Sequence, residues 1–243
     1  TNKKKQLPNV KTETIGPVNV NTAYTYRCMR GSTSIKLFRE EDLMKVFFHE
    51  TFHTFNMDFL NTGKKQIQEI FNINSSVSIF ESYCETWARI FHSLFLAIIQ
   101  NKMQDNNKIL KYFKALMCIE SLYSLLQSNK VFKHMNLTLE DVINNTEKLH
   151  ENFKENSHVF SYYFVTAILM LNINSFLNFC INNNTNILKF NPTNFNNFVI
   201  LIKDSKNSTI TQKCIQYYKS GDQEEMDKIM KDGSLKMILF KMF

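Results

Sequence analysis

The stretch FREEDLMKVFFHETFHTF, residues 38–55, contains the helix around which the rest of this 243-residue chain is predicted to fold. Its apolar residues recur at helical spacing, and three acidic residues at 40–42 place negative charge at the positive end of a helix. We therefore predict a helix over 40–59. Two histidines and a glutamate stand in this helix where Phe or Leu would pack better, which indicates a chemical role.

The segment HETFH, residues 49–53, fits the pattern H-E-x-x-H. On a helix, positions i and i+4 lie on one face, so the imidazoles of His49 and His53 can reach one metal ion. Glu50 is offset by one residue and can reach a water bound to that ion. Zn2+ is the cofactor that this pattern predicts. The alternative is that both histidines make ordinary hydrogen bonds on a structural helix.

Zinc needs a third protein ligand and an open fourth position. The segment IFESYCETWARIF, residues 79–91, carries Glu81 and Glu85 at i and i+4 on an otherwise apolar helix. Two carboxylates on one buried helix face repel each other, and their burial is costly unless a nearby cation compensates their charge. We predict that Glu81 is the third zinc ligand and that Glu85 accepts the second ring N–H of a zinc-binding histidine, although the two roles can be exchanged. A solvated acidic stripe, or pairing with Arg39 or Arg89, is the alternative.

Asp58 lies five residues after His53. Some zinc proteases use an Asp ligand downstream of H-E-x-x-H, but the Gly-Thr-x-Asp signature of that class is missing here. Asp58 is therefore predicted to lie at the helix end or to support a zinc ligand.

Together these residues resemble the gluzincin metallopeptidases. The resemblance rests on the H-E-x-x-H of 49–53, a Glu on a later helix, a second carboxylate four residues on and Cys84 just before it, and it covers about 18–91. The segments FREEDLMKVFFHETFHTFNMDF and ESYCETWA also resemble metallopeptidases of large DNA viruses. The resemblance implies a zinc-dependent enzyme that hydrolyses a peptide or protein substrate through a zinc-bound water, with Glu50 as general base. The chain departs from the family at Glu85, where Asp is commoner.

Gluzincins commonly supply a Tyr or His from their C-terminal helical part to hold the developing oxyanion. The segment SHVFSYY, residues 157–163, would place His158 and Tyr162 on one helix face at i and i+4. The predicted catalytic set is therefore Glu50 with Tyr162 or His158. The alternative for these two side chains is ordinary helix packing with their polar tips at the surface.

The predicted fold class is mainly α, of the α+β type, with a zincin-like active-site helix. Scarce Gly (5) and Pro (3) favour helices. Two alternating segments, 18–26 and 32–38, are predicted as strands. Residues 1–16 are predicted to form a flexible tail and 17–243 a single domain, with the β element and active-site helix in 17–75 and a helical lobe in 76–243. Further helices are predicted at 78–102, 107–127, 138–152, 157–181, 194–203, 211–218 and 223–230.

The net charge of +7 comes mostly from dispersed lysines, so it gives little support for nucleic acid as a partner. Five cysteines without a CxxC pair predict reduced thiols and an intracellular, cytoplasmic or virion-associated location. No apolar run reaches about 18 residues, so no membrane span is predicted.

The second hypothesis is a catalytically silent structural or virion protein with a metallopeptidase fold. The sequence determines neither the substrate nor the oligomeric state.

Overall fold

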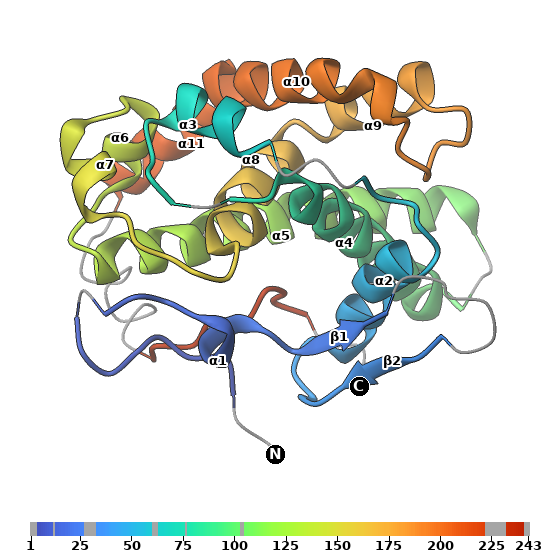
Figure 1. The fold of residues 1–243 in the computed structure, drawn as a ribbon. Helices are drawn as coiled ribbons and strands as arrows, with labels where there is room; N and C mark the ends of the chain where they lie inside the picture. The colour runs from blue at the N-terminus through green and yellow to red at the C-terminus, as the bar shows by residue number, and fades with distance from the viewer. Residues whose placement is uncertain are drawn as a thin grey trace.

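The computed structural model describes residues 4–11, 13–26, 33–59, 63–75, 77–102, 105–221 and 232–240. Within these ranges the chain is mainly helical, with a two-stranded antiparallel sheet near its N-terminus, so the predicted fold class is confirmed. In Figure 1 most helices form the upper body of the molecule, and the two strands lie beneath it together with the short helix α1.

The elements follow one another along the chain in this order: α1 Pro17–Val20, β1 Ala23–Thr25, β2 Ile35–Leu37, α2 Leu43–Thr54, α3 Lys64–Phe71, α4 Ile79–Gln100, α5 Asn106–His134, α6 Leu139–Ile143, α7 Glu147–Asn152, the π-helix η1 Ser161–Val165, α8 Thr166–Leu171, α9 Ile173–Asn183, the 3-10 helix η2 Pro192–Asn194, α10 Phe195–Asn207 and α11 Thr209–Ser220.

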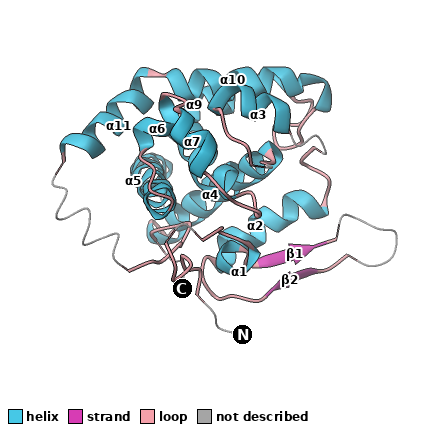
Figure 2. Ribbon diagram, turned by 60° about the vertical axis from the view of Figure 1, so that its left-hand side comes forward, coloured by secondary structure: helices cyan, strands magenta, loops and turns pink. Residues whose placement is uncertain are grey.

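Helix α4 runs through the centre of the body, between α2 on one side and α5 on the other (Figure 2). Most of its side chains are buried, including a polar face that carries Glu81, Glu85 and Arg89 at i and i+4 spacing, while its other faces are apolar. Aromatic side chains fill the space around it. The rings of Phe59 and Phe190 lie 4.0 Å apart, and Tyr83 of α4 packs edge-on against Phe190 at 5.2 Å. This packing fixes the face that α4 turns toward α2.

The predicted strand over 18–26 is only partly correct. Its first half is the short helix α1, because Pro17 stands at the first helical position, where a missing N–H costs nothing. The second half is β1, which pairs with β2 through Tyr24 and Lys36. The hydroxyls of Thr25 in β1 and Thr54 in α2 lie 2.7 Å apart, so the small sheet lies alongside the helix that carries H-E-x-x-H.

Two residues of the predicted flexible tail over 1–16, Lys5 and Ile15, are fully buried in the structure. The ammonium of Lys5 lies 3.0 Å from the carboxylate of Asp42 at the start of α2. The backbone N–H of Lys5 also donates to the Glu41 carboxylate at 2.7 Å. A buried ion pair is strongly destabilised when one partner leaves, so this contact holds the segment in place.

The segment 232–240 packs against the same end of α2. Leu235 donates its N–H to the carbonyl of Lys5 at 3.1 Å, and Met237 donates to the Asp42 carboxylate at 3.0 Å. Further on, the N–H groups of Leu239 and Phe240 bind the carboxylate of Glu120. The two ends of the described chain therefore meet at α2. The predicted helix over 223–230 lies outside the described residues.

Three other helix predictions are corrected. The helix predicted over 138–152 is interrupted at Asn145, which has a left-handed backbone (φ 52°). The helix predicted over 157–181 is broken at Asn172, where the axis turns by 92°. The Asn172 amide donates to the carbonyl of Ser205 and the hydroxyl of Thr211, so α10 and α11 stabilise the break.

Helix α3 was not predicted, and α2 ends earlier than expected, at Thr54.

No helix in the described ranges is both long enough and apolar enough to cross a membrane by itself. The bent pair Ser161–Leu171 and Ile173–Asn183 meets the length and composition test only when its two parts are taken together.

Candidate metal centre

Helices α2 and α4 bring three predicted ligands together. The Nε2 atoms of His49 and His53 lie 3.0 Å apart. One carboxylate oxygen of Glu81, in the first turn of α4, lies 3.1 Å from Nε2 of His49 and 3.3 Å from Nε2 of His53. Three donor atoms from two helices therefore form a nearly equilateral triangle.

The triangle has the dimensions of one face of a zinc coordination tetrahedron. Ligand atoms about 2.0–2.1 Å from a tetrahedral zinc ion lie roughly 3.3 Å from one another. The three donor–donor distances of 3.0, 3.1 and 3.3 Å match this spacing. The donor set of two imidazoles and one carboxylate is also one that zinc accepts in hydrolytic sites. The residues present therefore fit the metal.

Each histidine has a carboxylate beside its other ring nitrogen. Nδ1 of His53 lies 2.8 Å from Asp58, and Nδ1 of His49 lies 3.1 Å from Glu85. The His53 contact is a hydrogen bond, whereas the His49 contact has ion-pair distance without hydrogen-bond alignment. Carboxylates in these positions orient an imidazole so that Nε2 faces a metal. Glu85, predicted to accept this N–H, lies beside Nδ1 of His49 without that alignment, and Asp58 has the corresponding position beside Nδ1 of His53.

Two buried cations balance Glu85. Its carboxylate lies 2.8 Å from the Lys45 ammonium and 3.0 Å from Nε of Arg89, and all three side chains are buried. Burial alone would raise the pKa of Glu85, but the charges of Lys45 and Arg89 hold that pKa well below its usual value. Burial lowers the pKa of Lys45 to about 8, and the attraction of Glu85 opposes that shift. Glu85 is therefore a fixed negative charge behind His49.

The charges around the triangle favour a divalent cation. Burial disfavours protonation of His49, yet contacts with Glu81 and Glu85 raise its pKa, and the pKa of His53 is raised well above its usual value. Two protonated Nε2 groups could not face each other over 3.0 Å. Among the described residues, four carboxylates and two basic side chains lie around the imidazoles, so with both imidazoles neutral the acidic groups exceed the basic groups by two charges. The carboxylates and basic side chains are Glu50, Asp58, Glu81, Glu85, Lys45 and Arg89.

A small pocket of about 50 Å³ lies beside the triangle. Glu50 and Tyr162 both line it, together with residues 20–23, which lead into β1. The rings of His49 and Tyr162 are 6.0 Å apart. Burial, and then the charges of Glu81 and Glu50, raise the pKa of Tyr162 well above its usual value, so its hydroxyl keeps its proton. The structure therefore brings Glu50 and Tyr162 to one pocket.

His158 does not line the pocket that Glu50 and Tyr162 share. It has a left-handed backbone (φ 54°) and precedes η1, so the predicted helix face shared by His158 and Tyr162 is wrong. It is also absent from the groups of converging ligand atoms in the described chain. Tyr162 reaches the pocket from η1, which packs against α4.

Cys84 lies behind His53, with its sulfur 3.9 Å from Nδ1. His53, Asp58 and Cys84 form a second group of converging donor atoms, but it shares His53 with the first. Burial raises the pKa of Cys84 to about 12, so the thiol is neutral. The described cysteines are free thiols: Cys84, Cys118, Cys180 and Cys214.

Sequence reasoning missed two residues of the centre. Lys45 was not singled out, although it stands four residues before His49 on an apolar helix, and that spacing was a usable signal. Met237 lines the pocket, and its sulfur lies 3.0 Å from the Lys45 ammonium. No local pattern predicts this contact, because 192 residues separate the two.

Comparison with known proteins gives one distant relative. The chain is 27% identical over 184 residues to an uncharacterized protein of Acanthamoeba polyphaga mimivirus. The match covers 72% of this chain and 44% of that protein, so the chain spans less than half of the relative's length. No family model matches, and no solved structure is significantly similar. The predicted resemblance to a viral protein is confirmed to this extent.

Proposed function

We propose that this chain is a zinc-dependent peptidase. The observation that carries the proposal is the triangle of donor atoms from His49, His53 and Glu81, whose sides of 3.0–3.3 Å suit zinc. The carboxylates beside both Nδ1 atoms support it, because a structural histidine pair has no need of two buried acids. Glu50 on the neighbouring pocket adds a general base of the kind that H-E-x-x-H hydrolases use.

In the proposed hydrolysis, several residues of the chain have separate roles. Zinc, when bound, supplies a Lewis acid and lowers the pKa of a water to about 7. Glu50 takes the proton from the attacking water and passes it to the leaving amine. The Tyr162 hydroxyl, which keeps its proton, donates a hydrogen bond to the oxygen on which negative charge develops. Glu85 and Asp58 keep the two imidazoles in one orientation during this cycle.

The substrate is a peptide in an extended conformation. Residues 20–23 line the same pocket as Glu50, and β1, which begins at Ala23, pairs with β2. Extended peptides add readily to exposed strand backbone, so the substrate backbone is expected to run beside this segment. Specificity would then come from side chains on either side of the pocket.

Metal analysis of the purified chain tests the metal half of the proposal. We expect one zinc per chain in the wild type and in Glu50→Gln, and loss of that zinc in His53→Ala. The control is His150→Ala, which changes an exposed histidine of α7. Equal zinc content in all four proteins would exclude the triangle as the binding site.

Hydrolysis of a mixed peptide library, followed by mass spectrometry, tests the catalytic half. Glu50→Gln should keep zinc and lose activity by at least about 100-fold, because proton transfer contributes on the order of 10²–10⁴ in rate. Tyr162→Phe should reduce kcat by a similar factor with little change in KM, since it removes an oxyanion donor. Cleavage that survives Glu50→Gln would reject the assignment.

A catalytically silent zinc protein is the second candidate. The small size of the pocket, about 50 Å³, favours it, because the pockets that hold small-molecule ligands are usually several times larger. This candidate predicts the same zinc content but no cleavage of any library peptide by the wild type.

A further inference from the structure

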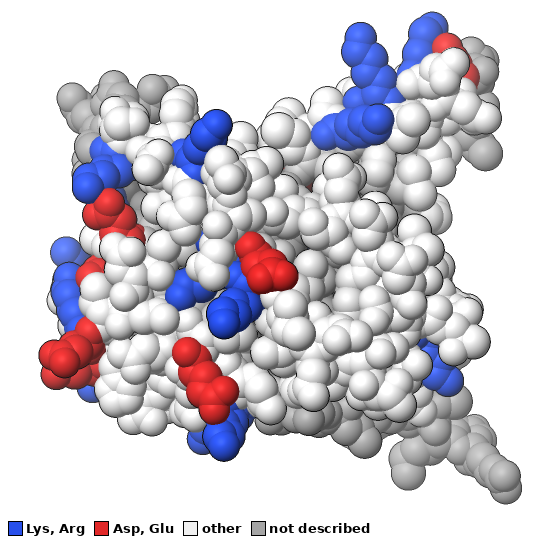
Figure 3. All heavy atoms as spheres, turned by 90° about the horizontal axis from the view of Figure 1, so that it is seen from above, with Lys and Arg blue, Asp and Glu red and all other residues white. Residues whose placement is uncertain are grey.

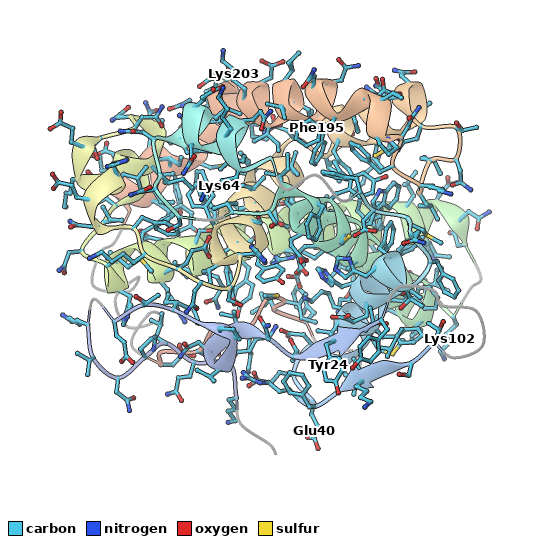
Figure 4. All side chains as sticks on the ribbon, viewed as in Figure 1. Tyr24, Glu40, Lys64, Lys102, Phe195 and Lys203 are labelled. Atoms are coloured by element: carbon cyan, nitrogen blue, oxygen red, sulfur yellow. The ribbon has the colours of Figure 1, made fainter. Side chains whose placement is uncertain are left out.

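A second cavity lies on the side of the helical body away from the strands. Helices α3 and α10 enclose a groove of about 520 Å³, a volume typical of small-molecule sites. Figure 4 labels Lys203 on α10 at the upper edge of the molecule, whereas Tyr24 of β1 lies in its lower part. The groove shares no lining residue with the metal pocket.

The floor of the groove holds a buried cation. Lys206 is 5% exposed, and its ammonium donates to the carbonyl of Ile70 at 2.8 Å and to the side-chain oxygen of Asn145 at 2.6 Å. Among the described residues no carboxylate forms an ion pair with it. Burial lowers the pKa of Lys206 to about 8, and no acidic neighbour opposes the shift. A buried charge without a counter-ion is costly, so the groove is suited to an anion.

The cation is held in a rigid position. Asn145 has a left-handed backbone (φ 52°), and its amide donates to the same Ile70 carbonyl at 2.9 Å. Asn72 donates to the backbone carbonyl of Asn145 at 3.2 Å. The ring of Phe71 lies 5.0 Å from the ammonium. Because these contacts already order the Lys206 side chain, little conformational entropy remains to be lost when a ligand binds.

A second lysine and an aliphatic wall complete the groove. Lys203 stands three residues before Lys206, on the same face of α10, and is exposed. Glu69 lies on the α3 wall, but no ion pair joins it to either lysine in the described structure. The remaining lining has three polar side chains, Gln66, Asn145 and Asn207, and an aliphatic wall of Ile70, Ile143, Val199 and Ile200. Viewed from above in Figure 3, Lys and Arg side chains form separate groups with acidic side chains among them, so this face lacks the continuous basic surface that nucleic acid requires.

We propose that this groove binds a small aliphatic carboxylate. The head group contacts Lys206 and Lys203, and the hydrocarbon part lies on the aliphatic wall. The two ammonium groups supply charge-assisted hydrogen bonds. The apolar wall is what selects an aliphatic acid over an inorganic anion, because a compact anion leaves that surface in contact with water.

The experiment is a titration of the full chain with sodium hexanoate, followed by backbone amide NMR shifts. We expect shifts at 66–70 and 199–207 and saturable binding. Lys203→Met should weaken that binding about tenfold, since one ion pair is lost. Lys213→Met, an exposed lysine of α11, is the matched control and should bind as the wild type does. Equal affinities for the two variants would overturn the proposal.

Two further arms define the ligand chemistry. Ile200→Glu places a carboxylate at an exposed position of the groove and should abolish hexanoate binding without disturbing the fold. Hexylammonium and inorganic phosphate should produce no saturable shifts at these positions. A response to phosphate equal to that of hexanoate, or hexanoate shifts that map elsewhere, would reject an aliphatic carboxylate. No hydrolysis is measured, so the result is independent of the proposed peptidase activity.

Discussion

His49 has a different partner at each ring nitrogen, and this asymmetry is the basis of the candidate metal centre. Nε2 faces His53 and Glu81, whereas Nδ1 faces Glu85. The spacing of i and i+4 on two helices predicted that these four side chains could converge, because helical periodicity is a local property. The same spacing places Lys45 on the His49 face of the helix, but it could not predict Glu85 as the partner of Lys45, since the partner of a side chain depends on which helix packs against it.

Lys45→Met tests the support behind His49. The change leaves the Glu85 carboxylate with Arg89 as its nearest buried cation, and a broken buried ion pair costs about 3–5 kcal/mol. We expect the free energy of unfolding in urea to fall by that amount and zinc affinity, measured against a chelator, to fall about 10–100-fold. Lys108→Met removes an exposed lysine 4.0 Å from Asp105 and should change neither value appreciably. Unchanged zinc affinity in Lys45→Met would mean that Glu85 does not act through His49.

At the scale of elements, the type of each long helix could be predicted, but its breaks could not. The strong apolar periodicity of α4 placed that helix to within about two residues. Asn145 and Asn172 interrupt two other predicted helices because their side chains bind residues far away in sequence, Ile70 and Ser205 among them. Asparagine competes well for backbone partners, but only the tertiary structure supplies those partners.

The segment that leads into η1 should make stability depend on pH. Burial raises the pKa of Glu155 to about 8 from an ordinary value of 4.5, while the N–H of Phe160 opposes the shift. The folded state therefore favours the protonated acid. This contribution is fully present below pH 4.5 and is lost as the pH rises through 8.

Glu155→Gln keeps an acceptor for the Phe160 N–H and removes the titration. We expect the free energy of unfolding of the variant to fall less than that of the wild type between pH 5 and pH 8, measured by urea denaturation. Glu151→Gln, an exposed position on α7, should retain the wild-type profile. Parallel profiles for wild type and Glu155→Gln would show that this carboxyl is not the cause.

At the scale of the whole molecule, segments near both ends of the described chain meet at the start of α2. Asp42 accepts from Lys5 on one side and from Met237 on the other. Met237 also lines the pocket beside the candidate metal centre, so the segment 232–240 contributes to that pocket. The sequence suggested a polar tail at 1–16 because local composition cannot reveal a buried partner.

Lys5→Ala should therefore destabilise the whole fold. The variant leaves Asp42 buried, with Lys45 as the remaining nearby cation, and we expect a loss near the lower end of the range for broken buried pairs, about 3 kcal/mol. Lys4→Ala changes the neighbouring exposed lysine and should stay within about 0.5 kcal/mol of the wild type. Similar unfolding energies for both variants would mean that the N-terminal segment does not hold α2.

The sequence by itself determined the helical class, the helix with H-E-x-x-H and the four side chains that could meet around one cation. These follow from periodicity and residue chemistry, which act over one or two helical turns. Only the tertiary structure decided that Glu81 faces both Nε2 atoms, that Lys45 neutralises Glu85, and that residues near both chain ends pack behind α2. Such contacts join residues about 30 to 200 positions apart, and burial, which no local pattern contains, sets their energies.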